Sequence, residues 1–90
     1  MKQAQHLIVS GRVQGVGFRY FAQVTALEYG VTGWVRNLND GTVELQVEGD
    51  EERLESYKRA LYDGNRFVGV ERIEAKDTTV ESFRKFDIRY

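Results

Sequence analysis

The chain has 90 residues, of which 41% are hydrophobic and 30% charged, and its formal net charge is −1. This length allows one compact domain over residues 1–90, and the near-neutral charge disfavours a general nucleic-acid binder, which usually carries a basic excess. The chain contains no cysteine, which excludes disulfide bonds, thiolate zinc sites and cysteine nucleophiles.

The first third of the chain predicts a strand followed by a helix. Residues 6–13 alternate in the way that is typical of a strand, and one face would carry Leu7, Val9, Gly11 and Val13. Residues 20–30 predict a helix that ends at Gly30. Its apolar residues lie within one helical arc, which we expect to be buried: Tyr20, Phe21, Val24 and Leu27.

Residues 31–49 predict a β-hairpin. Apolar residues at 43, 45 and 47 alternate with Glu44, Gln46 and Glu48, so one face should be buried and the other should face water. The sequence NDG at residues 39–41 provides residues that tolerate the positive φ of a tight turn.

The second half predicts a helix and two strands. Asp50 can cap the helix, and Gly64 can end it. The apolar stripe of this helix comprises Leu54, Tyr57 and Leu61. Residues 66–77 and 85–90 read as strands. The resulting order is β-α-β-β-α-β, with a short strand added at the end. We therefore predict an α+β fold, a ferredoxin-like βαββαβ sandwich whose antiparallel sheet carries two helices on one face.

The stretch GRVQGVGFRYF, residues 11–21, places a cation where the first helix begins. A helix N-terminus carries a partial positive charge, so Arg19 is disfavoured there unless something negative binds. Residues Gln14 to Phe18 could form a nest of backbone N–H groups for an anion, with Gly15 and Gly17 supplying positive φ. A forked guanidinium would complete the shell of a phosphate-like ligand. The alternative is a tight turn with a solvated arginine. The stretch matches neither a Walker motif nor a dinucleotide fingerprint.

Two motifs in this sequence resemble the signatures of the acylphosphatase family. The first is GRVQGVGFR at residues 11–19, and the second is GWVRNLNDGTVELQVEG at residues 33–49. The resemblance covers essentially the whole chain, including the aromatic-rich end FDIRY. It implies metal-free and cofactor-free hydrolysis of small acyl phosphates, without a covalent phosphoenzyme. It assigns phosphate binding to Arg19 and to backbone N–H groups of residues 14–19, namely Gln14, Gly15, Val16, Gly17, Phe18 and Arg19. It assigns orientation of the attacking water to Asn37.

Two other functions fit parts of the sequence. An RNA-binding module can share this topology, but the expected wet face of residues 44–48 is acidic and would repel phosphates. A non-catalytic ligand sensor could keep the anion nest, although the presence of both Arg19 and Asn37 favours an enzyme. His6 is expected at the surface or at a sheet edge. The N-terminal stretch lacks the long apolar core of a signal peptide, and no segment reaches transmembrane length. We therefore expect a cytoplasmic monomer without membrane or nucleic-acid partners.

Overall fold

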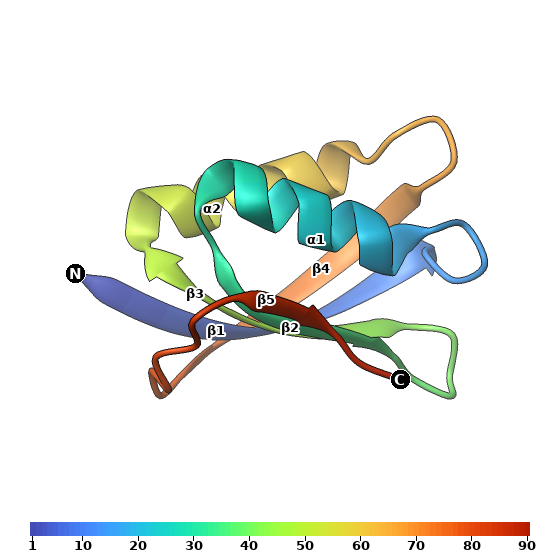
Figure 1. Cartoon of the computed structure of the whole chain (residues 1–90). Helices are drawn as coiled ribbons and strands as arrows, with labels where there is room; N and C mark the ends of the chain where they lie inside the picture. The colour runs from blue at the N-terminus through green and yellow to red at the C-terminus, as the bar shows by residue number, and fades with distance from the viewer.

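Seven elements follow one another in the order predicted from the sequence. The computed structural model describes all 90 residues. The elements are β1 (Lys2–Arg12), α1 (Phe18–Tyr29), β2 (Thr32–Asn37), β3 (Val43–Asp50), α2 (Glu51–Asp63), β4 (Gly69–Thr78) and β5 (Phe86–Ile88). Figure 1 shows both helices packed side by side on one face of a single sheet. The predicted ferredoxin-like sandwich is therefore confirmed.

The sheet has the strand order β4-β1-β3-β2-β5. The four longer strands pair antiparallel, as predicted. The short β5 adds to β2 in parallel, with Gly33 opposite Phe86 and Val35 opposite Ile88. The two outer strands are thus the long β4 and the three-residue β5. This arrangement brings the end of the chain beside β2 (Figure 1). There the carbonyl oxygen of Arg89 accepts a hydrogen bond from Arg19, near the start of α1.

The core lies between the helices and the sheet. The predicted stripe of α2 is confirmed, because Leu54, Tyr57 and Leu61 are all buried. Capping of this helix is also as predicted: the Asp50 side chain accepts from the backbone N–H of Arg53 at 2.9 Å. In the core, the Tyr57 hydroxyl donates to the carbonyl oxygen of Ala22 at 2.9 Å and so ties α2 to α1.

The prediction of which face of α1 is buried was wrong for three of its four residues; the fourth, Phe21, is partly buried against the core. Three of the residues expected in the core are exposed: Tyr20 (68%), Val24 (46%) and Leu27 (84%). The buried residues of α1 are instead Phe18, Ala22, Thr25 and Ala26. Both arcs of this helix are apolar enough to be buried, and the small side chains at 22, 25 and 26 allow the helix to approach the sheet closely. Size, rather than hydrophobicity, decides which arc faces the core.

The sheet face opposite the helices is less wet than predicted. Gln46 and Glu48 are buried, at 6% and 1% exposed, and the segment 79–85, between β4 and β5, packs against Glu48. The Glu48 carboxylate accepts hydrogen bonds from the backbone N–H groups of Glu81 and Phe83, the latter at 3.1 Å. Gln46 donates to the hydroxyl of Thr78 at 2.6 Å. Strand alternation places these side chains on one face correctly, but it does not show that a distant segment covers that face.

Candidate active site

A five-residue loop, residues 13–17, joins β1 to α1. Gly15 and Gly17 adopt left-handed conformations with φ of 74° and 79°. A Cβ added at either glycine would contact no atom within 4 Å, so these positions need glycine for the backbone conformation and not for space. Gly17 is the N-cap of α1 and provides no capping side chain. The orphan N–H groups at the start of the helix are therefore left uncapped.

The backbone donors of this loop are free over a long stretch. No N–H group of residues 14–20 donates a hydrogen bond to another protein group; the first that does is that of Phe21, which donates to the Gly17 carbonyl oxygen at 3.0 Å. The first turn of α1 also lacks an acidic side chain. Unpaired N–H groups and the positive end of the helix dipole together favour an anion at this place.

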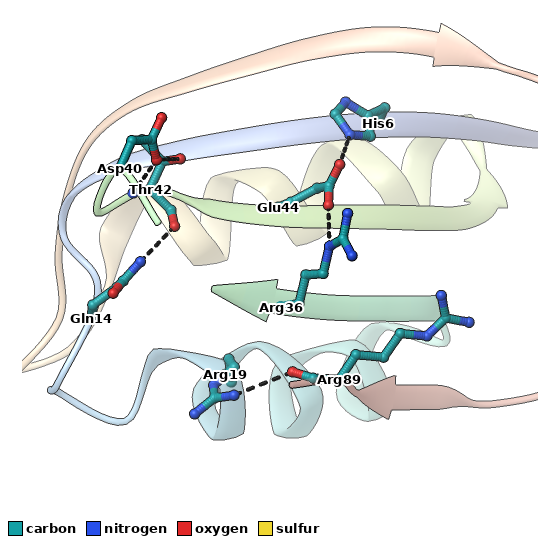
Figure 2. Close-up of polar contacts among 8 residues, drawn as sticks. All are labelled: His6, Gln14, Arg19, Arg36, Asp40, Thr42, Glu44 and Arg89. Atoms are coloured by element: carbon teal, nitrogen blue, oxygen red, sulfur yellow. Dashed lines mark hydrogen bonds and ion pairs between the residues drawn. The ribbon is translucent and has the colours of Figure 1, made fainter. Parts of the chain in front are cut away.

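Arg19 is held at the start of α1 by the end of the chain. Its Nη1 atom donates to the carbonyl oxygen of Arg89 at 3.2 Å (Figure 2), and its guanidinium carbon lies 4.5 Å from the centre of the Tyr90 ring. The backbone N–H of Arg89 in turn donates to the carbonyl oxygen of Val35 on β2 at 2.8 Å. One carbonyl oxygen and one ring face occupy only part of the guanidinium, so several of its donors stay available.

Asn37 is the last residue of β2 and pairs with Val43 on β3. Its Oδ1 atom is buried and has no hydrogen-bond partner within the protein. A buried and unpaired amide oxygen is costly, so an external donor such as a water or a ligand would stabilise this position.

A hollow of about 230 Å³ brings most of the predicted site residues together. It is smaller than the pockets of about 300–1,000 Å³ that usually bind drug-sized molecules. Its lining comprises Val13, Gly15, Gly17, Phe18, Arg19, Tyr20, Asn37, Ile88 and Tyr90. Arg19 and Asn37 therefore share one small cavity, together with both glycines and Phe18. Gln14 and Val16 do not line it.

The side chain of Gln14 holds the loop in place, whereas the sequence predicted only that its backbone N–H binds phosphate. Its Nε2 atom donates two hydrogen bonds across to the β2–β3 turn, to the carbonyl oxygens of Leu38 at 2.7 Å and Thr42 at 2.8 Å. Figure 2 shows Gln14 reaching Thr42 from the loop. This amide fastens the donor-rich loop to the hairpin that carries Asn37.

The β2–β3 turn has its own internal hydrogen bonds. Asp40 accepts from the hydroxyl of Thr42 at 2.6 Å and from its backbone N–H at 3.0 Å. These hydrogen bonds from Thr42 lower the pKa of Asp40 below its ordinary value. Gly41 has a φ of 92°, as the tight turn predicted at residues 39–41 requires. The partner of Gln14 is therefore a defined turn.

On the opposite sheet face, beside Asn37, an ion-pair cluster crosses three strands (Figure 2). Glu44 lies between Arg36, at 2.5 Å, and His6, at 2.7 Å. Burial alone would raise the pKa of Glu44, but the hydrogen bonds from His6 and Arg36 outweigh it and lower that pKa. His6 lies on β1, which has a neighbouring strand on each side, so the alternative of an edge position was wrong. Neither His6 nor Glu44 lines the hollow.

Sequence reasoning missed the contribution of the C-terminus to the site. Arg89, through its carbonyl oxygen, and Tyr90, through its ring, position Arg19, and Ile88 adds to the lining of the hollow. In the sequence, the aromatic-rich end FDIRY points to the site only as part of the family resemblance. A pairing between residues 70 positions apart leaves no local pattern that would have identified it.

Comparison with known proteins places the chain in one family. The Acylphosphatase family model matches residues 5–88. An acylphosphatase of Bacillus licheniformis is 48% identical over 85 residues, which cover 93% of this chain and 94% of that protein. The crystal structure of acylphosphatase from Bacillus subtilis matches all of both chains with a TM-score of 0.91 and 43% identity. The crystal structure of full-length HypF in its phosphate- and nucleotide-bound form matches with a TM-score of 0.85 and 28% identity, and there this chain covers 12% of the larger protein. With one family model and close relatives matched over nearly its whole length, the chain belongs to the acylphosphatase family.

Proposed function

We propose that this chain hydrolyses acyl phosphates to a carboxylate and inorganic phosphate by direct attack of water. In this proposal the phosphate binds to the backbone N–H groups of residues 14–19 and to the guanidinium of Arg19, and Asn37 orients the water. The observation that carries it is the run of unpaired N–H groups over residues 14–20, which surrounds Arg19 in the hollow that also contains Asn37.

The chemistry of acyl phosphates suits a site with so few functional groups. The leaving group is a carboxylate, whose conjugate acid has a pKa of about 4, so it departs without a general acid. The transition state of phosphoryl transfer is loose and spreads negative charge over the equatorial oxygens. Positioning and electrostatic stabilisation can then supply most of the catalysis. The N–H groups and Arg19 would supply the second of these.

Water activation is assigned to the Asn37 amide and to the substrate itself. The side chain of Asn37 makes no hydrogen bond within the protein, and its oxygen is buried, so the amide is free to accept a hydrogen bond from a water in the hollow. No histidine, aspartate or glutamate lines the hollow. We infer that a phosphate oxygen of the substrate takes the proton of the attacking water. A pH–rate profile controlled by a protein carboxylate or by His6 would contradict this inference.

The test follows the loss of benzoyl phosphate in the presence of EDTA, with the wild type, Arg19→Lys and Arg53→Lys. We expect the wild type to turn over the substrate and Arg19→Lys to lose on the order of 100- to 1000-fold in kcat/KM, because a point charge does not reproduce the forked donors. Arg53 is the matched control: it is an exposed arginine in the first turn of α2, and its guanidinium lies near Gly30, at the far end of α1 from Arg19. Its lysine variant should retain wild-type turnover.

Three outcomes would contradict the proposal in different ways. A wild type that binds inorganic phosphate without hydrolysing benzoyl phosphate would indicate a ligand sensor. Near-normal turnover in Arg19→Lys would remove the forked guanidinium from the mechanism. Activity abolished by EDTA would refute a metal-free reaction.

The monomeric state and the cytoplasmic location stay predictions; analytical ultracentrifugation measures the first. Neither helix of the structure is long and apolar enough to span a membrane.

A further inference from the structure

Two tyrosines stand at the hollow with their rings open to solvent. Tyr20 is 68% exposed and Tyr90 is 96% exposed, and both line the hollow that contains Arg19. Single exposed aromatic residues are common on protein surfaces. Here two of them line one small cavity together with Ile88 and Arg19. We call these three apolar residues the wall of the hollow, and Arg19 with the unpaired N–H groups its floor.

The polar and apolar parts of the hollow match the two parts of an acyl phosphate. The phosphoryl group carries the negative charge, so the unpaired N–H groups and Arg19 attract it to the floor. The acyl group is joined to the phosphorus through one bridging oxygen and must therefore lie within a few bonds of that floor. Val13 and Phe18 also line the hollow but are only 1% exposed, so the apolar surface that an acyl group can reach comes mainly from the wall of Tyr20, Ile88 and Tyr90. Flat, apolar acyl groups gain most from aromatic walls, through burial and ring stacking.

We propose that Tyr20 is a specificity-determining residue, which with Ile88 and Tyr90 forms an acyl subsite that favours aromatic over short acyl phosphates. This proposal rests on the proposed function, because the phosphate must occupy the floor for the acyl group to meet the wall. The subsite is open to solvent, so its effect is a preference among substrates and not an exclusion.

Substitution of Tyr20 tests the acyl subsite more directly than substitution of Tyr90. The Tyr90 ring already packs on the Arg19 guanidinium at 4.5 Å, so its substitution would also disturb the phosphate site. Tyr20 has no aromatic partner and no side-chain hydrogen bond within the protein, and it is exposed on the first turn of α1. Its ring is therefore available for a ligand, and alanine at this position suits a helix.

The experiment compares kcat/KM for benzoyl phosphate with kcat/KM for acetyl phosphate, as a ratio, in four proteins: the wild type, Tyr20→Ala, Tyr20→Phe and Tyr62→Ala. An aromatic contact of this kind corresponds to a change of about 2- to 10-fold. We expect the ratio to fall by that factor in Tyr20→Ala and to stay at the wild-type value in Tyr20→Phe, which keeps the ring. Tyr62 is the matched control, a tyrosine that is 54% exposed on α2 and does not line the hollow.

Two results would overturn the subsite. One is that Tyr20→Ala leaves kcat/KM unchanged for both substrates; the other is an equal loss on both substrates, which would indicate a general disturbance of Arg19. Both leave the ratio at the wild-type value. Failure of the proposed function looks different, because the wild type would then hydrolyse neither substrate. A binding measurement keeps the subsite testable in that case: calorimetry should show benzylphosphonate binding more tightly than methylphosphonate to the wild type, with the difference lost in Tyr20→Ala. Equal affinity of the two phosphonates for the wild type would refute the aromatic wall.

Discussion

Removing the Gln14 amide should weaken both the fold and the site. Its Nε2 atom donates two hydrogen bonds, at 2.7 and 2.8 Å, to carbonyl oxygens of the β2–β3 turn. A neutral hydrogen bond contributes a net of about 0.5–1.5 kcal/mol. The Gln14→Ala variant should therefore lose about 1–3 kcal/mol of unfolding free energy. Gln14→Glu should lose more, because a carboxylate oxygen would then face two carbonyl oxygens.

Gln14→Ala should also lower activity, because the Gln14 amide fixes the loop of unpaired N–H groups against the end of β2, which carries Asn37. A misplacement of about 1 Å in a catalytic arrangement costs about 100-fold in rate, and Arg19 keeps its own anchor at Arg89. We therefore expect a partial loss of kcat/KM, between about 10- and 100-fold. Urea unfolding followed by the fluorescence of the single tryptophan, Trp34, measures stability, and benzoyl phosphate hydrolysis measures activity.

Gln23 provides the control for this prediction. Its Nε2 atom also donates to a backbone carbonyl oxygen, that of Phe86 at 3.0 Å, but it does not line the hollow. Gln23→Ala should lose about 0.5–1.5 kcal/mol of stability and keep its kcat/KM. The reasoning is refuted if Gln14→Ala is destabilised as expected and yet retains wild-type kcat/KM, since the loop would then hold its shape without this amide.

Three further changes test other parts of the structure. Asn37→Ala should lower kcat while the inhibition constant of inorganic phosphate stays near the wild-type value; a matching loss of phosphate affinity would make Asn37 a binding residue. Glu44→Gln should cost about 0.2–1 kcal/mol of unfolding free energy at pH 7. The pKa of Glu44 is lowered in the folded chain, so its ion pairs stabilise the fold above the ordinary glutamate pKa of about 4.3. Urea titrations should show this stabilisation vanish as the pH falls below that value. Burial raises the pKa of Tyr57 well above its ordinary value, so stability should fall as the pH rises above about 10, and Tyr57→Phe should remove that alkaline loss. At neutral pH the same variant should lose about 0.5–1.5 kcal/mol, because its hydrogen bond to Ala22 is gone.

The elements that could be predicted were those whose pattern has a single solution. In α2, one arc is apolar and the rest is mostly charged, so Leu54, Tyr57 and Leu61 were expected to face the core. In α1, two arcs compete, and the choice depends on how closely the helix approaches the sheet, which the sequence does not state. Burial of Glu48 on β3 could not be predicted either. The alternation of β3 is regular and predicts an exposed side chain, but residues 79–85 cover Glu48.

The candidate site divides in the same way. Arg19 and Asn37 could be named from motifs, and the structure brings both to one hollow. The roles of the Gln14 side chain and of Arg89 could not be named, because each depends on a contact between residues 24 or more positions apart. A local motif specifies the backbone that presents donors, whereas the contacts that hold this backbone in place belong to the tertiary fold.

The two outer strands of the sheet affect how readily copies of this protein associate at high concentration. An outer strand exposes unpaired backbone groups that can recruit a second copy and begin aggregation. Here one border is β5, which is only three residues long. The other border is β4, whose sequence GVERIEAKDT is crowded with charges of both signs. A second copy would have to strip water from those charges or settle on a strand too short to hold it. The molecule can therefore keep an open, aromatic-rimmed cavity in a crowded solution while both borders of its sheet discourage self-association.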